Sequence, residues 1–253
     1  MKPATDYKIV KTGDGTFTAR SAQFDECYHS TKDGALNESL KKHVEPAFSL
    51  IDPSKKELVI LDICFGLGYN TLATLHYVQS RNISKKIHIV SPEFDEALVR
   101  SLHAFPYPEE FEKYLPIIGK ISECGYYEEE NIEIEVIFGD ARDFLKTTTF
   151  VFDIVYQDAF SPKKNPSLWT KEYFFNLASH LAPDAIITTY SSATPVRMGM
   201  VESGLYVYTP PSTKVRSGTI ASPSSKLPLP SIDMALKKVR NPSAKPLYDD
   251  DLK

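Results

Sequence analysis

Acidic side chains stand at the ends of four hydrophobic runs in this sequence: Asp62, Glu93, Asp140 and Asp158. A single acid in such a place is commonly a helix cap or a turn residue, because its carboxylate accepts backbone N–H groups. Four acids at successive chain crossovers indicate a ligand-binding site, since ligands of open parallel sheets bind outside the carboxyl ends of the strands. Carboxylates gathered there suit a ligand that carries positive charge and hydroxyl groups.

A glycine-rich turn directly follows the first of these acids, in the stretch LVILDICFGLGYNTL. Gly66 and Gly68 favour a backbone that can approach a ligand closely. A dinucleotide site would need a third glycine where this chain has Thr71. The amine, sulfonium and ribose diol of S-adenosylmethionine match the nearby carboxylates better. The predicted cofactor residues of this loop are Asp62, Gly66, Gly68 and Asn70.

Strand-like and helical patterns alternate through the middle of the chain, which is typical of a doubly wound parallel sheet. We predict a Rossmann-like α/β fold with a mostly parallel, seven-stranded sheet and an N-terminal extension made of a β-hairpin and a helix. The expected strands are residues 58–63, 87–90, 132–138, 151–156, 185–190, 205–208 and 219–221, and the expected helices are residues 71–79, 96–103, 109–118, 140–145, 171–181 and 196–202.

Segments before and after this sheet are predicted to form the extension and a tail. Residues 7–10 and 16–19 bracket a Gly-Asp-Gly turn, which predicts the hairpin, and residues 35–50 have helical spacing. Glu38 and His43 miss the i, i+4 spacing of a metal pair, so we expect ordinary roles on the helix surface. The tail, rich in Pro and Ser, is expected to be an extended strap or a mobile end. The predicted division is 1–50, 51–222 and 223–253.

Charge is unevenly distributed along the chain, although the net charge is only −4. Residues 109–135 carry seven more acids than bases, and residues 211–245 carry six more bases than acids. Such asymmetry can leave a basic face for a polyanion on an acidic protein, although most charge runs are simply solvated surface.

Cysteine spacing and hydropathy exclude several classes of protein. Cys27, Cys64 and Cys124 are odd in number and lack CxxC spacing, which disfavours a disulfide framework or a zinc site. No window approaches the roughly 18 to 20 apolar residues that a membrane-spanning helix needs, and the N-terminus lacks an apolar leader. We therefore expect a cytoplasmic protein that binds neither a membrane nor a metal.

Five segments together carry a family resemblance: DICFGLGYNTL, SPEFD, GDAR, QDAFSPKKNPSLWT and TTYSSATPVRMGMVESGL. They resemble the class I S-adenosylmethionine-dependent methyltransferases and, more narrowly, the methyltransferase part of the MnmC family. That family methylates the 5-aminomethyl group of the wobble uridine in tRNA. The resemblance implies S-adenosylmethionine as cofactor and the tRNA anticodon region as partner, with no obligate protein partner. The segment after residue 223 lacks the length and glycine pattern of the fused flavin oxidase, so we expect no FAD.

The resemblance also implies roles for individual residues. The loop of Gly66 and Gly68 would pass the methionine portion, and Glu93 would hold the ribose diol. Asp140 with Ala141 would meet the adenine.

Asp158 would face the acceptor amine, either as a base or only to position it. The sequence departs from the family pattern at Cys64, where many class I enzymes have glycine, at Pro92, and at residues 216–218.

Residues near Asp158 supply candidates for contact with RNA. Phe160 and Tyr190 could stack on an extruded uracil or pack in the core. Basic side chains near the same loops are candidate phosphate contacts. These are Lys163, Lys164, Arg197 and Arg216.

Two rival interpretations stay open. An aminopropyltransferase-like or other small-amine transferase would also pair a nucleoside sulfonium with an amine and an acid after the fourth strand. A non-catalytic RNA-binding or nucleotide-binding module is the alternative from another class, and Asp158 argues against it.

Overall fold

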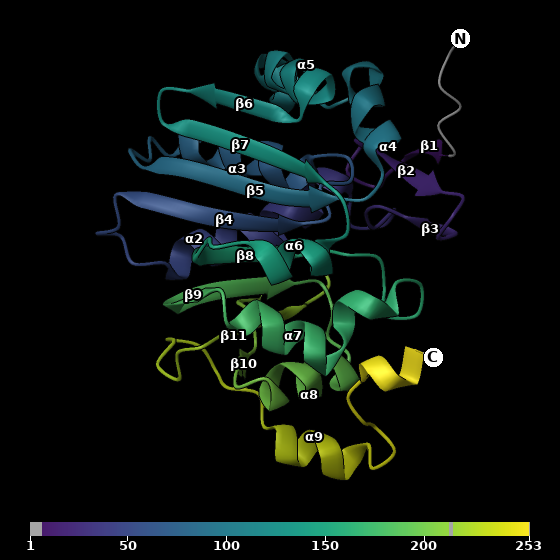
Figure 1. Cartoon of the computed structure of the whole chain (residues 1–253), viewed down its shortest axis with the longest axis vertical. Helices are drawn as coiled ribbons and strands as arrows, with labels where there is room; N and C mark the ends of the chain where they lie inside the picture. Colours follow the sequence, from purple (N-terminus) through teal and green to yellow (C-terminus); the bar gives the residue numbers. More distant parts are fainter. Residues whose placement is uncertain (1–6, 213–214, 253) are drawn as a thin grey trace.

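The computed structural model of this chain describes residues 7–212 and 215–252. Its largest element is a single sheet with helices on both faces (Figure 1). In spatial order the strands are β10 (Tyr206–Tyr208), β11 (Thr219–Ser222), β9 (Leu181–Thr189), β8 (Phe152–Gln157), β4 (Glu57–Ile63), β5 (Lys86–Glu93), β7 (Ile132–Phe138) and β6 (Tyr126–Glu129). The central strands, from β9 to β7, are parallel. The predicted Rossmann-like, mostly parallel α/β fold is confirmed.

The chain switches direction across the sheet between β4 and β8. From β4 it proceeds to β5 and β7 on one side, and it later returns to β8 and β9 on the other. β4 and β8 are parallel, with Ile60 opposite Ile154 and Asp62 opposite Tyr156. The loops that leave their carboxyl ends therefore diverge, which opens the crevice where ligands of such sheets bind.

Hydrophobic cores lie on both faces of the sheet, because successive side chains of a strand point to opposite faces. In β4, Leu58 and Ile60 belong to one core, whereas Leu61 and Ile63 belong to the other. The first core is covered by α1 (Ala35–Glu38), η1 (Ser39–Val44), α2 (Glu45–Leu50), α3 (Tyr69–Ser80), α4 (Glu96–Ser101), η2 (Leu102–Ala104), η3 (Glu109–Tyr114) and α5 (Leu115–Cys124). The second is covered by α6 (Ala141–Thr147), η4 (Pro166–Trp169), α7 (Lys171–Ala178) and α8 (Thr194–Glu202). Among the described residues, no helix is long and apolar enough to cross a membrane.

The predicted count of seven strands is wrong, because the described part of the sheet has eight. The additional strand is β6, which pairs antiparallel with β7 at the sheet edge. Its sequence, YYEE, is acidic and largely exposed, so it lacks the alternation of apolar and polar residues that identifies a half-buried strand. Charged side chains are common on edge strands, where they discourage pairing with other chains.

The N-terminal extension forms a separate small sheet. β1 (Tyr7–Lys11) and β2 (Phe17–Ser21) make the predicted hairpin, and β3 (Glu26–Cys27) adds a short third strand that the sequence did not indicate. The predicted helix at 35–50 is present, but its middle turn, η1, is a π-helix.

The tail docks on the second face and contains α9 (Met234–Arg240) and η5 (Asp249–Leu252). The Lys171 N–H donates to the Leu247 carbonyl at 2.8 Å, and Arg142 pairs with Asp249 at 2.5 Å. The strap alternative therefore describes the tail better than a mobile end, although α9 is helical. The division at residues 50 and 222 stays a prediction.

Candidate active site

A cavity of about 560 Å³ lies at the carboxyl ends of the central strands. One wall is the glycine loop after β4, with Glu93 at the end of β5 and Asp158 just after β8. The opposite wall comes from the N-terminal extension, which contributes Phe24, Tyr28 and further side chains. The extension thus completes a site whose other half belongs to the main sheet.

The glycine loop has the backbone conformation that its sequence predicts. Gly66 has a φ of 53° and Gly68 a φ of 71°, both in the left-handed region that favours glycine. A Cβ on Gly68 would lie 2.9 Å from the ring of Phe65, so this position also lacks room for a side chain. Cys64 adopts a φ of 68°, which explains why glycine is common there in the class I enzymes that this sequence resembles.

Glu93 is buried and linked to this loop through hydrogen bonds to its carboxylate. The Gly66 N–H donates to one carboxylate oxygen at 2.8 Å, and the Asp95 N–H donates to the other at 2.7 Å. Burial raises the pKa of Glu93, and these donors partly oppose that increase. Each carboxylate oxygen retains a further lone pair, so the residue can still accept from ribose hydroxyls.

Asn70 links the buried carboxylate of Asp62 to the carboxylate of Asp158, which lines the cavity. Its side-chain N–H group donates to Asp62 at 3.2 Å and to Asp158 at 2.9 Å. The hydroxyl of Thr71 donates to the second oxygen of Asp62 at 3.1 Å. Asp62 is completely buried and does not line the cavity. Burial and the neighbouring Asp158 raise the pKa of Asp62 to about 7.

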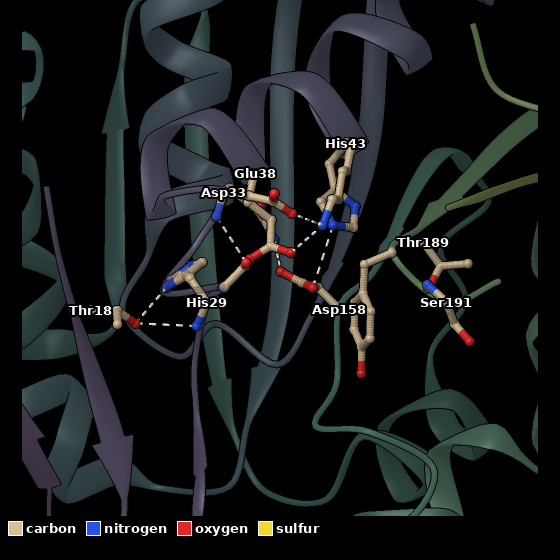
Figure 2. A network of polar contacts seen from close by, with 12 residues as sticks. Thr18, His29, Asp33, Glu38, His43, Asp158, Thr189 and Ser191 are labelled. Carbon is tan, nitrogen blue, oxygen red and sulfur yellow. Dashed lines mark hydrogen bonds and ion pairs between the residues drawn. The ribbon is translucent and has the colours of Figure 1, made fainter. Parts of the chain in front are cut away.

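His43 lies against Asp158 (Figure 2) and is not among the residues that line the cavity. Its Nε2 lies 3.4 Å from an Asp158 carboxylate oxygen, and its Nδ1 lies 3.1 Å from the Thr188 hydroxyl. Burial raises the pKa of Asp158, but interactions with His43, His29 and the Asn70 amide outweigh burial and hold this pKa below its ordinary value. The carboxylate therefore stays ionised at neutral pH.

The expectation of surface roles for Glu38 and His43 is wrong. His43 is fully buried, and only 6% of Glu38 is exposed. Glu38 accepts hydrogen bonds from the Lys42 ammonium at 2.7 Å and from the Ser30 N–H at 2.5 Å. This segment packs against α3 and β9, and helical spacing alone could not show that its polar side chains turn inward.

The predicted aromatic residues both line the cavity. Phe160 stacks on Phe24 with ring centroids 4.5 Å apart, and it also contacts Tyr28 at 4.9 Å. The Tyr190 hydroxyl donates to the Ala159 carbonyl, which fixes the ring beside the loop that carries Asp158. Sequence reasoning missed Phe24, Tyr28 and His29, because nothing in the extension resembles a known site motif.

The predicted basic residues separate into two groups. Lys163 and Lys164 are exposed in the loop after Asp158, and Arg216 is exposed at the cavity. Arg197 is only 8% exposed, and its guanidinium donates to the Thr219 hydroxyl and the Gly218 carbonyl. This burial does not support a phosphate contact for Arg197, which instead holds the start of β11.

Asp140 and Ala141 lie outside the cavity lining among the described residues. Asp140 caps α6, where its carboxylate accepts the Arg142 N–H at 2.7 Å. Its carboxylate is occupied locally, so the predicted adenine contact stays a prediction.

The polar groups of this cavity fit S-adenosylmethionine. Glu93 offers a carboxylate for a diol, and the glycine loop offers close backbone approach. The buried Oδ1 of Asn70 has no hydrogen-bond partner within the described residues, which leaves an acceptor for an ammonium group. The fold and this site together define a class I S-adenosylmethionine-dependent methyltransferase.

Comparison with known proteins agrees with this class. Residues 108–224 match the family model described as S-adenosyl-L-methionine-dependent methyltransferase. The crystal structure of MnmC2 from Aquifex aeolicus superposes with a TM-score of 0.85 at 32% identity, covering 99% of this chain and 81% of that one. The chain belongs to the MnmC type of these methyltransferases.

Two curated relatives are longer than the matched region. An uncharacterised protein of Methanocaldococcus jannaschii is 32% identical over 80% of this chain and 55% of its own length. The tRNA 5-methylaminomethyl-2-thiouridine biosynthesis bifunctional protein MnmC of Campylobacter fetus is 30% identical over 79% of this chain and 32% of its own length. The chain thus spans about a third of that bifunctional relative.

Proposed function

We propose that this chain transfers a methyl group from S-adenosylmethionine to the 5-aminomethyl group of the wobble uridine in tRNA, giving 5-methylaminomethyl-uridine. The observation that carries the proposal is Asp158, an ionised carboxylate beside the glycine loop and at the wall of the cavity. The name of the Campylobacter relative, a tRNA 5-methylaminomethyl-2-thiouridine biosynthesis protein, suggests the substrate class. A tRNA substrate would place this activity in the cytoplasm.

Each wall of the cavity has a proposed role. The backbone of Gly66, which lines the cavity, is proposed to lie along the methionine portion, and Gly68 shapes the same turn without lining the cavity. Glu93 accepts from the ribose diol. The adenine is proposed to extend beyond the cavity lining towards Asp140 and Ala141, at the start of α6. S-adenosylmethionine supplies an electrophilic methyl group, and Asp158 binds the acceptor ammonium and aims its nitrogen.

The nucleic acid would enter from the side of the extension. Phe160 and Tyr190, which line the cavity, are proposed to stack on the extruded base. Exposed basic side chains around the mouth would neutralise phosphates near the anticodon. These are Lys163, Lys164 and Arg216.

Labelled S-adenosylmethionine, incubated with tRNA that carries unmethylated 5-aminomethyl-uridine, tests the proposal. We expect label in the wobble nucleoside with the wild type and a loss on the order of 100-fold or more for Asp158→Ala. Asp143→Ala is the matched control, because Asp143 is an exposed acid on α6. Label in polyamine products instead of tRNA would support a small-amine transferase, and label in neither would favour a binding module.

A further inference from the structure

A π-helical turn brings His43 against Asp158 from the side opposite the cavity. Such turns are rare and are frequently found at functional sites. His43 is fully buried and absent from the cavity lining, so it can touch the acceptor only through Asp158. Its ring also packs edge-on against Tyr156 with centroids 5.8 Å apart, which fixes the plane of the imidazole.

The contact between His43 and Asp158 lacks a hydrogen bond. Nε2 is buried and has no hydrogen-bond partner within residues 7–212 and 215–252, although it lies 3.4 Å from the carboxylate. In the tautomer whose Nδ1–H donates to Thr188, the Nε2 lone pair faces the Asp158 oxygen. A proton between Nε2 and the Asp158 oxygen would form a hydrogen bond that joins the two side chains. In this tautomer the pair can therefore accept one proton.

Amine methylation creates the need for such an acceptor. An alkyl ammonium has a pKa of about 10 and lacks a lone pair, so it must lose a proton before transfer. A carboxylate such as Asp158 binds an ammonium well but is a weak base, because the ordinary pKa of an aspartate is about 4. An imidazole, with an ordinary pKa of about 6.5, is better matched to neutral pH.

Resting on the proposed function, we propose that His43 is a positioning residue that aims Asp158 at the acceptor nitrogen and holds, through that carboxylate, the proton that the amine loses. The ammonium N–H bond breaks, and the proton passes by way of Asp158 to Nε2 of His43. The freed lone pair forms the N–C bond while the S–C bond breaks and its electron pair stays on sulfur. The imidazolium later returns the proton to solvent.

Most of the charged groups around His43 favour a positive charge on its ring. Carboxylates at the ends of two strands, Asp62 and Asp158, stabilise the imidazolium, whereas a charged His29 would oppose it. Burial lowers the pKa of His29, which keeps that ring neutral at pH 7. Further titratable neighbours among the described residues are Tyr156 on β8 and, on the same helical segment, Glu38 and Lys42. Lys42 pairs with both Glu38 and Asp33.

His43→Gln tests the proposal, because an amide keeps an N–H near Asp158 but cannot hold a proton. Single-turnover methylation of tRNA bearing 5-aminomethyl-uridine is measured from pH 6.5 to 9.5. We expect a loss on the order of 100-fold at pH 7 that shrinks below about tenfold at pH 9.5, where much of the amine is already free. A purely structural role would lower the rate by the same factor at every pH, and that result would overturn the proposal.

Controls separate this outcome from misfolding. His88→Gln is matched, since His88 is also a buried histidine beside a carboxylate, Glu135 at 2.9 Å, but lies outside the cavity lining. It should retain the wild-type rate at every pH. Calorimetric affinity for S-adenosylmethionine should change less than about threefold in His43→Gln. If that variant does not fold, Thr188→Val replaces it and should shift the low-pH limb of the rate profile, whereas an unshifted limb would contradict the proposal.

An activity-independent readout distinguishes failure of this inference from failure of the proposed function. At pH 7 the NMR signal of the His43 Nε2 nitrogen should shift between the wild type and Asp158→Asn, because the carboxylate that lies 3.4 Å away loses its charge. An unchanged signal would show that His43 and Asp158 do not interact, whatever the substrate. If the wild type does not methylate tRNA, the proposed function is wrong, and the proton-holding role is wrong with it. The NMR comparison would still show whether His43 and Asp158 interact.

Discussion

The side-chain amide of Asn70 donates to the carboxylate of Asp158 at 2.9 Å, tying the first turn of α3 to the end of β8. Asn70→Ala would leave the buried Asp62 and the partly buried Asp158 without their shared donor. We expect the free energy of unfolding to fall by about 1–3 kcal/mol, as for other unsatisfied buried groups. Urea unfolding at pH 7.5 measures it. Asn176→Ala on α7 is the control and should change stability by less than about 0.5 kcal/mol; an equal effect of both would contradict the prediction.

Asp62 should make stability depend on pH. Its pKa is raised to about 7 in the folded state, so between about pH 4 and 7 the folded chain binds a proton that the unfolded chain releases. Stability from this group is therefore complete at low pH and falls by about 1.4 kcal/mol per pH unit as pH rises through that window. Asp62→Asn should lose this slope and gain stability relative to the wild type from pH 5 to 8. The free energy of unfolding in urea is measured at several pH values for both proteins. If it changed with pH in the same way in the wild type and in Asp62→Asn, the raised pKa of Asp62 would be refuted.

Glu93 should control affinity for the methyl donor. Glu93→Gln turns an amide N–H towards one of the two backbone donors, Gly66 or Asp95, and removes the charge that a ribose diol would meet. We expect the dissociation constant for S-adenosylmethionine to rise about 10- to 100-fold, the range for a hydrogen bond to a charged group. Calorimetry measures it. Glu96→Gln, at an exposed position on α4, should bind normally.

Two basic surfaces can be distinguished by charge reversal. Lys163→Glu with Lys164→Glu changes the loop beside the cavity, and Lys237→Glu with Lys238→Glu changes α9, which lies beyond α8 (Figure 1). We expect the first pair to weaken tRNA binding and to reduce the slope of log affinity against log salt by about 1 to 2. Filter binding at several salt concentrations measures both quantities. If the α9 pair weakened tRNA binding more than the first pair, the RNA contact would lie on the tail and not on the loop beside the cavity.

Much of the main fold could be predicted from the sequence. Strands β4, β5 and β8 are largely buried on both faces, and each contains a short, mainly apolar run that indicates a strand. The glycine turn is also local, since positive φ at Gly66 and Gly68 depends on a few neighbouring residues. The edge strand β6 was missed because its exposed acidic sequence carries no hydrophobic period.

The sequence by itself determined the parallel sheet, the glycine loop and the position of Asp158 at a strand end, because each depends on short-range pattern. Tertiary structure decided which polar side chains meet. His43 contacts Asp158 only because the extension packs against the sheet and its π-helical turn rotates the ring inward. Arg197 is likewise buried by a strand that follows it in the chain. Burial of these side chains is set by contacts between distant segments, which local spacing does not encode.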